Sequence, residues 1–397
     1  MTERIYYTDP YATEFDATVV RAEAVADAPT RRRVVLDRTA FYPTSGGQPF
    51  DTGMLGEVRV LEVEDGDDGE VVHMVEGDVG SGVVHGRIDW ERRFEHMQQH
   101  TGQHVLSAAF DRVLKVPTVS FHLGAASSTI DLAREVSAAE IARAEREANR
   151  IVWDDRPVAI RFADAAEAAM LGLRKESKRE GVLRLIDVED FDISACGGTH
   201  VARTGAIGMI AVAGAERFKG GTRLEFLCGG RALAGYHALR DSVAGSVRLL
   251  SVLPAELPSA IERAQAEARE LRGEIKDLHG RLAGHEAASL MVRAEPAGAS
   301  RAVVAALAGW DANGLKAIAS TIAARPGHVA VLISTPAPAA VVVARSPDVT
   351  IDASATLKKL TSQFGGKGGG RPELAQGGGL QGDVEEMLRA ARALLTA

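Results

Sequence analysis

Short hydrophobic runs rich in β-branched residues fill the first part of the chain, up to about residue 90. They include residues 17–20, 33–36, 58–61 and 71–74, and clusters of glycine and aspartate separate them. Short runs of this kind, bounded by turn-forming residues, are typical of β-strands. We therefore expect a small all-β unit over residues 1–90, in the form of a barrel.

The pattern becomes helical near Trp90. A helix is predicted from there on, with an apolar set made of Phe94, Met97, Val105, Phe110 and Val113. A second helix is predicted over residues 137–152, because Ser137 and Glu140 have the spacing of a capping box at its start.

Strand-like runs return at residues 183–188 and 206–213. Because helices and strands both occur between residues 91 and 245, we expect an α+β domain there.

The most regular pattern in the chain is a heptad repeat, which we expect to form a helical linker over residues 246–290. Its apolar positions alternate in spacings of four and three: Leu257, Ile261, Ala264, Ala268, Leu271, Ile275, Leu278 and Leu282. Pro254 and Pro258 mark its start. A seam of this length either pairs two chains into a homodimer through residues 257–282 or folds back on its own chain.

Residues 291–397 are expected to form an α/β domain. The continuous apolar runs 329–333 and 341–343 read as buried strands, and residues 383–395 as a terminal helix. The fold class of the whole chain is thus α+β.

Glycines and cations gather between these elements. Residues 364–372 read FGGKGGGRP, and three further glycines follow at 377–379. We interpret this segment as a loop whose backbone approaches a polyanion, against the alternative of a flexible linker. Its candidate contacts to such a polyanion are Lys367, Gly368, Gly369, Gly370 and Arg371.

The composition of the chain bears on its cellular compartment. No apolar run approaches the ~20 residues of a membrane-spanning helix, and the N-terminus lacks the apolar stretch of a secretion signal. We therefore expect a cytoplasmic protein with no membrane partner. The chain has two cysteines, too few for a disulfide framework.

Charge leaves the class of partner open. The net charge of -8 argues against nucleic acid, but phosphates are bound by local basic patches. Such patches occur at Arg31 to Arg33, at Arg92 and Arg93, at Arg174, Lys175, Lys178 and Arg179, at Arg217, Lys219 and Arg223, and at Lys358, Lys359, Lys367 and Arg371.

Two segments carry the residues of a metal site. His96, His100 and His104 are spaced four apart and would share one face of a helix. Far downstream, Cys196 and His200 flank a Gly-Gly-Thr turn. Two imidazoles from the helix with this thiolate and imidazole make a tetrahedral set that suits zinc better than magnesium or calcium. Spacing alone leaves open whether His96 or His104 partners His100.

Three segments together resemble the editing region of alanyl-tRNA synthetase and the free-standing AlaX proteins. They are residues 39–49 (TAFYPTSGGQP) with Asp51, the pair His100 and His104, and residues 196–201 (CGGTHV). Residues 368–378 (GGGRPELAQGG) also resemble the C-terminal DHH-associated domain of that synthetase. The order of the regions is that of a long-form AlaX protein, with no class II aminoacylation core before the β unit.

The resemblance implies a zinc-dependent aminoacyl-tRNA hydrolase. It assigns the zinc to His100, His104, Cys196 and His200, which selects His104 over His96. It implies that the chain deacylates tRNA(Ala) mischarged with serine, and also glycine, without charging tRNA. If all four ligands bind, no position stays open for water. Either one ligand, such as Cys196, is then displaced, or the zinc positions the substrate for a second water.

Selectivity requires contacts beyond the zinc. An alanine pocket rejects serine by only about 10²-fold, so a second site must recognise the added hydroxyl. Candidates for that hydrogen bond are Gln103, Thr118 and Ser120. By resemblance, residues of the glycine motif would contact the substrate or the tRNA end. They are Thr44, Gly46, Gly47 and Gln48.

Two other functions remain. A zinc hydrolase of another substrate, such as a peptidase, is disfavoured because no acidic residue lies between His100 and His104. A tRNA-binding module with a purely structural zinc agrees with four filled positions.

Overall fold

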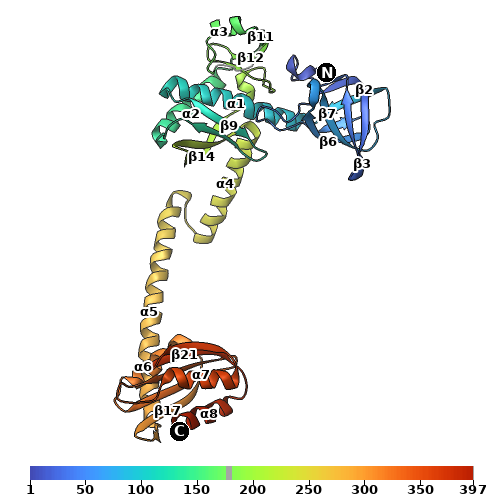
Figure 1. Ribbon diagram of the computed structural model, residues 1–397. Helices are drawn as coiled ribbons and strands as arrows, with labels where there is room; N and C mark the ends of the chain where they lie inside the picture. Colours follow the sequence, from blue (N-terminus) through green and yellow to red (C-terminus); the bar gives the residue numbers. More distant parts are fainter. Residues whose placement is uncertain (176–180, 397) are drawn as a thin grey trace. The chain divides into compact units, whose positions relative to one another are not determined.

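The computed structural model describes residues 1–175 and 181–396. The chain forms two compact units, Met1–Ser246 and Val247–Ala397 (Figure 1). Lys178 and Arg179 of the predicted basic patch lie outside the described residues.

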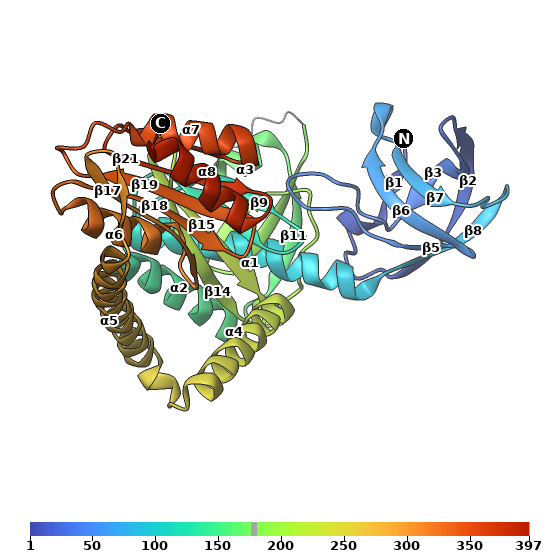
Figure 2. The ribbon, with the colours of Figure 1, turned by 90° about the horizontal axis from the view of Figure 1, so that it is seen from below.

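The first part of the N-terminal unit is a closed barrel with the strand order β2-β3-β7-β6-β5-β8 (Figure 2). Its strands are β2 (Glu14–Val25), β3 (Ala28–Leu36), β5 (Gly53–Leu55), β6 (Val58–Asp65), β7 (Val71–Glu76) and β8 (Val83–Ile88). A short parallel pair, β1 (Glu3–Arg4) with β4 (Arg38–Thr39), lies beside it. Buried side chains such as Val34, Phe41 and Val60 fill the interior. The predicted barrel is confirmed.

Helix α1 (Trp90–Leu114) leads from the barrel into the second part of the unit (Figures 1 and 2). The side chain of Asp89 accepts a hydrogen bond from the Arg92 N–H and so caps its start. Every residue from His96 to Phe110 is buried. Because α1 is covered on all sides, its polar residues must find partners within the protein.

Two sheets and further helices surround α1. One sheet has the order β14-β15-β10-β9 and the other the order β11-β12-β13. The strands are β9 (Thr118–Leu123), β10 (Ser128–Leu132), β11 (Val158–Ala163), β12 (Leu183–Val188), β13 (Asp192–Ala195), β14 (Ile210–Phe218) and β15 (Gly221–Cys228). The helices are α2 (Ala138–Trp153) and α3 (Ala165–Met170). The α+β prediction is confirmed.

Two local predictions for this region differ in outcome. The capping box of Ser137 and Glu140 at the start of α2 is present in both directions, as predicted. The strand predicted over residues 206–213 is partly wrong, because η3 (Thr204–Ile207) forms a 3₁₀ turn and strand β14 begins only at Ile210. Gly208 at φ +81 separates the two elements, a conformation that favours glycine.

Two helices and a 3₁₀ turn follow along the chain: α4 (Gly229–Leu250), η4 (Pro254–Glu256) and α5 (Leu257–Val292). Helix α5 contains the whole predicted heptad seam. Pro258 lies in its first turn, where a missing N–H costs nothing. Among the helices that the structure describes, none has the length and apolarity needed to cross a membrane.

The C-terminal unit is built on a sheet with the order β16-β17-β18-β19-β21-β20. Its strands are β16 (Glu295–Ala297), β17 (Ser300–Ala308), β18 (His328–Thr335), β19 (Ala339–Arg345), β20 (Lys367–Arg371) and β21 (Leu374–Leu380). One face packs on α6 (Ala312–Ala323) and the end of α5, and the other on α7 (Ala353–Phe364) and α8 (Val384–Thr396). Strands β18 and β19 are buried, as predicted.

The prediction of a glycine-rich loop is wrong. Lys367–Arg371 forms the edge strand β20, which pairs antiparallel with β21. A Cβ on Gly368 would lie 2.5 Å from the Gly377 Cα, so the glycines let the two backbones approach closely. All five residues of β20 are exposed.

Candidate metal centre

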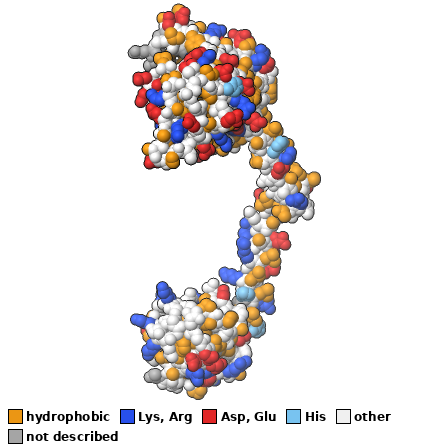
Figure 3. Space-filling model, turned by 90° about the vertical axis from the view of Figure 1, so that its right-hand side faces the viewer, with side chains coloured by type: hydrophobic (Ala, Val, Ile, Leu, Met, Phe, Trp, Pro, Cys, Tyr) orange, Lys and Arg blue, Asp and Glu red, His pale blue; other side chains and the backbone are white. Residues whose placement is uncertain are grey.

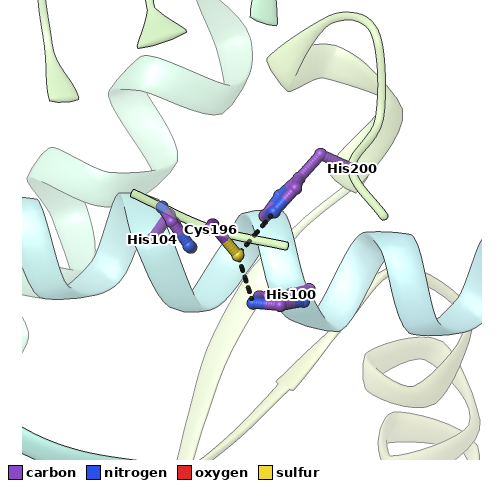
Figure 4. Close-up of side chains that lie close together, drawn as sticks. All are labelled: His100, His104, Cys196 and His200. Carbon is purple, nitrogen blue, oxygen red and sulfur yellow. Dashed lines mark hydrogen bonds between the residues drawn. The ribbon is translucent and has the colours of Figure 1, made fainter. Parts of the chain in front are cut away.

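Four side chains from two distant segments converge inside the N-terminal unit. His100 and His104 come from α1, and Cys196 and His200 from the segment after β13 (Figure 4). Their ligand atoms all lie within 4.8 Å of one another. The Cys196 Sγ is 3.3 Å from the Nε2 atoms of both His100 and His200. His96, which spacing alone allowed as a ligand, is not part of this cluster.

The local sequence explains the convergence. Four residues apart on α1, His100 and His104 present their imidazoles on one face. Cys196 directly follows β13, and the next two residues are glycines. A Cβ on Gly198 would lie 2.2 Å from Cε1 of His100. Only glycine therefore lets the turn pass close enough to bring the thiol onto the histidines.

Hydrogen bonds select the tautomers of two imidazoles. The His100 Nδ1 lies 2.8 Å from Oε1 of Gln48, an oxygen that can only accept. The His200 Nδ1 lies 3.2 Å from Oγ1 of Thr101, whose hydroxyl donates to the Met97 carbonyl at 2.8 Å. Both Nδ1 atoms are thus donors, and both Nε2 lone pairs are free to bind a metal ion.

The third imidazole is held by a carboxylate. The His104 Nδ1 lies 3.3 Å from Oδ2 of Asp192. That carboxylate also accepts from Arg174 Nε at 2.7 Å and from Ser194 Oγ at 2.9 Å. A carboxylate behind a histidine orients the ring and raises the basicity of the opposite nitrogen.

The donor set fits zinc. Three imidazole Nε2 atoms and one thiolate form a set of the kind that binds Zn²⁺ in tetrahedral sites, whereas magnesium and calcium select oxygen ligands. Each imidazole has a protein acceptor behind it, as metal-binding histidines usually do. Two of these contacts are hydrogen bonds and the one at His104 is an ion-pair contact, so the four side chains are oriented as a group that could hold a metal ion.

The electrostatics of the cluster favour metal-binding forms at two residues. Burial by itself raises the pKa of the Cys196 thiol, but the imidazoles of His100 and His200 outweigh it and hold that pKa well below its usual value. Burial lowers the pKa of His200 to about 3. Burial also lowers the pKa of His104, but hydrogen bonds with Asp192 and Cys196 prevail and raise it to about 9.

A cavity of about 910 Å³ opens beside the cluster, and His104 and Cys196 form part of its wall. Of the predicted substrate contacts, five line it: Gly46, Gly47, Gln103, Thr118 and Ser120. Thr44 is exposed on the barrel and Gln48 is buried behind His100. Gln48 therefore contacts His100, a candidate metal ligand, and does not line the cavity. The predicted RNA contacts Lys367 to Arg371 lie in the other unit.

Polar groups on the cavity wall are arranged around Ser107. Its hydroxyl accepts from Gln103 Nε2 and from Thr118 Oγ1, both at 2.8 Å. Gln103 is 2% exposed, and its Oε1 has no hydrogen-bond partner within residues 1–175 and 181–396. The Ser120 hydroxyl is already bonded to Asp131 at 2.6 Å. Gln103 is thus the buried group with an acceptor left to offer.

The glycine motif forms a tight turn at the edge of the cavity. Ser45 and Gln48 pair across it, with Gly46 at φ +53 and Gly47 at φ +83. A two-residue turn of this hand needs positive φ at both central positions. A Cβ on Gly47 would lie 2.9 Å from the Phe121 ring. The turn thereby packs on β9 and places the Gln48 amide behind His100.

Sequence reasoning missed Thr101, which holds His200, and two residues on neighbouring strands, Asp192 and Arg184. Asp192 holds His104, and Arg184 Nη1 donates to the carbonyl oxygens of Cys196 at 2.7 Å and Gly198 at 2.9 Å. The only feature of the sequence that could have indicated Asp192 and Arg184 is their position in the strands before the Cys-Gly-Gly-Thr-His segment. Their partners become visible only when these strands are paired.

Comparison with known proteins identifies the family. Residues 2–92 match the family "tRNA synthetases class II (A)", residues 183–225 the "Threonyl and Alanyl tRNA synthetase second additional domain", and residues 299–397 the "DHHA1 domain". The chain is 33% identical over 390 residues to the alanyl-tRNA editing protein AlaX-L of Pyrococcus horikoshii, covering 95% of this chain and 94% of that protein. The chain belongs to the AlaX-L family.

Longer relatives share the same region. The chain is 36% identical over 398 residues to the alanine–tRNA ligase of Pyrococcus abyssi, and it spans 42% of that protein's length. A solved structure, the C-Ala domain of the Aquifex aeolicus alanyl-tRNA synthetase, matches 26% of this chain and 98% of that chain at 22% identity, with a TM-score of 0.25. In this AlaX-L family member, the second additional domain match contains Cys196 and His200.

Proposed function

We propose that this protein is a zinc-dependent trans-editing deacylase. Its substrate would be tRNA(Ala) carrying the wrong amino acid, chiefly Ser-tRNA(Ala) and also Gly-tRNA(Ala). The observation that carries the proposal is a zinc-type ligand set in the wall of a cavity, in a chain of the AlaX-L family. Such a reaction belongs where tRNA is charged, which favours the cytoplasm.

Different residues would bind the metal, face the ester and position the ligands. His100, His104, Cys196 and His200 would hold the zinc. When bound, zinc would polarise the ester carbonyl and make hydroxide available near neutral pH. Because His104 and Cys196 line the cavity, the acyl group would approach the cluster from their side. The barrel supports this site through Gln48, which orients His100.

Gln103 is the group best placed to recognise serine. Its Oε1 is buried in the cavity wall and has no partner among the residues described. A serine hydroxyl that donates to this oxygen would satisfy it, whereas the methyl group of alanine would leave it unpaired. Glycine lacks the hydroxyl as well, so this hydrogen bond would make Ser-tRNA(Ala) the chief substrate and Gly-tRNA(Ala) the slower one, and exclusion of Ala-tRNA(Ala) would need a further contact.

The remainder of the chain would bind RNA and a second chain. Lys367 and Arg371 on the exposed edge strand β20 offer cations to tRNA phosphates. On α5 the seam residues Leu271, Ile275 and Leu278 are 49%, 54% and 57% exposed, which favours a homodimer over packing within the chain.

A second function has one observation in its favour. Four protein ligands fill a tetrahedral zinc, as in structural sites, and leave no position for water. The protein would then be a tRNA-binding module with a structural zinc. A deacylase with this ligand set would need Cys196 displaced, or the zinc positioning the aminoacyl group for a second water.

One assay separates these functions. The zinc-loaded protein is incubated with Ser-tRNA(Ala), Gly-tRNA(Ala), Ala-tRNA(Ala) and a panel of peptides, and release of the amino acid is followed with and without a chelator. We expect hydrolysis of Ser-tRNA(Ala) and of Gly-tRNA(Ala), survival of Ala-tRNA(Ala) and the peptides, and loss of activity with chelator. Binding of all three tRNAs without hydrolysis would favour the structural zinc, and cleaved peptides would indicate a peptidase.

A further inference from the structure

Three side chains form a row across the sheet β11-β12-β13. Phe162 on β11 is directly opposite Arg184 on β12. On the other side of β12 the pairing of Leu185 with Ala195 places Arg184 opposite Cys196, and the Cys196 N–H donates to the Arg184 carbonyl at 3.0 Å. Opposed residues of antiparallel strands point to the same face. All three residues line the cavity.

The row runs from the cavity rim to the metal ligands. Phe162 is 51% exposed, Arg184 is 7% exposed, and Cys196 belongs to the ligand cluster. Neighbouring strands are ~4.8 Å apart, so the row spans about 10 Å. One nucleoside that carries an acyl group is of this size. The order of aromatic ring, cation and metal ligand matches its order of base, ribose and ester.

Arg184 has unmet bonding capacity in the middle of the row. Its Nε donates to the Tyr7 carbonyl at 2.9 Å, and its Nη1 donates to two carbonyl oxygens of the Cys-Gly-Gly turn. Its Nη2 is buried without a hydrogen-bond partner, and no carboxylate lies within ion-pair distance, in the part of the chain that the structure describes. A buried guanidinium in this state is stabilised by an oxygen-rich ligand.

The rim around Phe162 suits a nucleobase and its phosphate. Val119 and Val182 also line the cavity and are 55% and 70% exposed. Arg174 and Lys175 line it as well; Arg174 is paired with Asp192, and Lys175 supplies positive charge. An exposed aromatic ring beside cations is the usual platform for single-stranded RNA, because every base has a face that can stack.

We propose that Phe162 is the stacking platform for the terminal nucleobase of the RNA substrate. Stacking there places the ribose beside the Arg184 guanidinium and the ester beside His104 and Cys196. This inference rests on the proposed function for the identity of the acyl group. It does not depend on hydrolysis, because the stack forms with uncharged RNA too.

The test measures equilibrium binding to the full-length, zinc-loaded protein. The probes are the RNA trinucleotide CCA, the sequence at the 3′ end of tRNA, and the same trinucleotide with an abasic terminal ribose. We expect the wild type to bind CCA about 10-fold more tightly than the abasic probe, the preference that loss of one base–aromatic stack predicts. Phe162→Ala should bind both probes with the weaker affinity, and Phe162→Trp should restore the preference.

A matched control is Trp153→Ala, which removes an aromatic side chain that is 74% exposed at the end of α2 and absent from the described cavity wall. It should keep the preference for the base. Zinc content and thermal unfolding of Phe162→Ala should equal those of the wild type. A wild type without preference for the base, or a Phe162→Ala variant that keeps it, would overturn the proposal. A base preference without deacylation would remove only the proposed function.

Discussion

The candidate metal centre depends on residues outside its proposed ligand set. Gln48 and Thr101 each accept a hydrogen bond from the Nδ1 of one imidazole, and an Asp192 oxygen lies 3.3 Å from the Nδ1 of His104. Partners of this kind are worth about 10- to 100-fold in metal affinity, because they fix both tautomer and ring orientation. At the scale of single residues, the site therefore extends into the barrel, where Gln48 lies, and into β13, which provides Asp192.

The two candidate histidines on α1 lead to a first prediction. His104→Ala and Cys196→Ala should each remove most of the zinc from a protein that otherwise holds about one ion per chain, while His96→Ala should retain it. His96 is buried away from the cluster, and burial lowers its pKa to about 3, so it is a neutral packed residue. Metal analysis of the purified variants decides the matter. A zinc-free His96→Ala variant that remains folded would contradict the ligand set.

Substrate selectivity leads to a second prediction, at Gln103. Gln103→Leu keeps the side-chain volume but removes the free Oε1, so kcat/KM for Ser-tRNA(Ala) should fall about 5- to 150-fold, the effect of about 1–3 kcal/mol. Hydrolysis of Gly-tRNA(Ala), which offers no hydroxyl, is the internal control and should change much less. Equal losses for both substrates would show that Gln103 supports the site without selecting serine.

At the scale of elements, two segments carry surfaces that their own unit leaves uncovered. Strand β20 presents an exposed sheet edge. Helix α5 is buried mainly near its end, at Ala283, Ala287 and Leu290, where it packs in the C-terminal unit. Hydrophobic side chains stand among charged ones along its remaining surface (Figure 3). Association of apolar seams is the usual way in which such a helix is covered.

A third prediction concerns this helix. Changing Leu271 and Ile275 together to Asp should convert a dimer to a monomer in sedimentation experiments, because two charges would enter the apolar seam of each chain. The matched control, Ala266→Asp with Gly273→Asp, adds the same charge on the opposite, exposed side of α5. It should leave the dimer intact. A wild type that sediments as a monomer would contradict pairing through this seam.

At the scale of the whole molecule, the two compact units divide the proposed tasks. The metal ligands, the cavity and the Phe162 row belong to Met1–Ser246, and the β20 edge belongs to Val247–Ala397. Each unit has its own hydrophobic core. We therefore expect that the hydrolytic activity and the affinity for full-length tRNA can be changed separately.

A fourth prediction follows for removal of residues 291–397. Zinc content and hydrolysis at saturating tRNA should persist, while affinity for full-length tRNA should fall. The log–log dependence of affinity on salt should flatten by about one unit for each lost phosphate contact. A short aminoacylated acceptor-stem mimic should be cleaved equally by both proteins. Unchanged tRNA affinity at every salt concentration would exclude β20 as an RNA contact.

The sequence by itself determined most elements and the chemical type of the site. The capping box at Ser137, the heptad spacing after Leu257 and the short hydrophobic runs of the first 90 residues are local patterns, which can be recognised without knowing the tertiary contacts. The Cys-Gly-Gly-Thr-His segment indicated a metal site, because it contains a thiolate and an imidazole at close spacing. None of this required knowing which strands are neighbours.

Only the tertiary structure decided which side chains meet. His96 and His104 are equivalent by spacing, and the packing of β13 against α1 brings Asp192 and Cys196 to His104. The glycines of β20 look like a loop until strand pairing shows two backbones in close contact. Likewise, strand pairing is what places Phe162 in line with Arg184 and Cys196 on the cavity wall. Such contacts join residues far apart in the chain, so their energies leave no local pattern in the sequence.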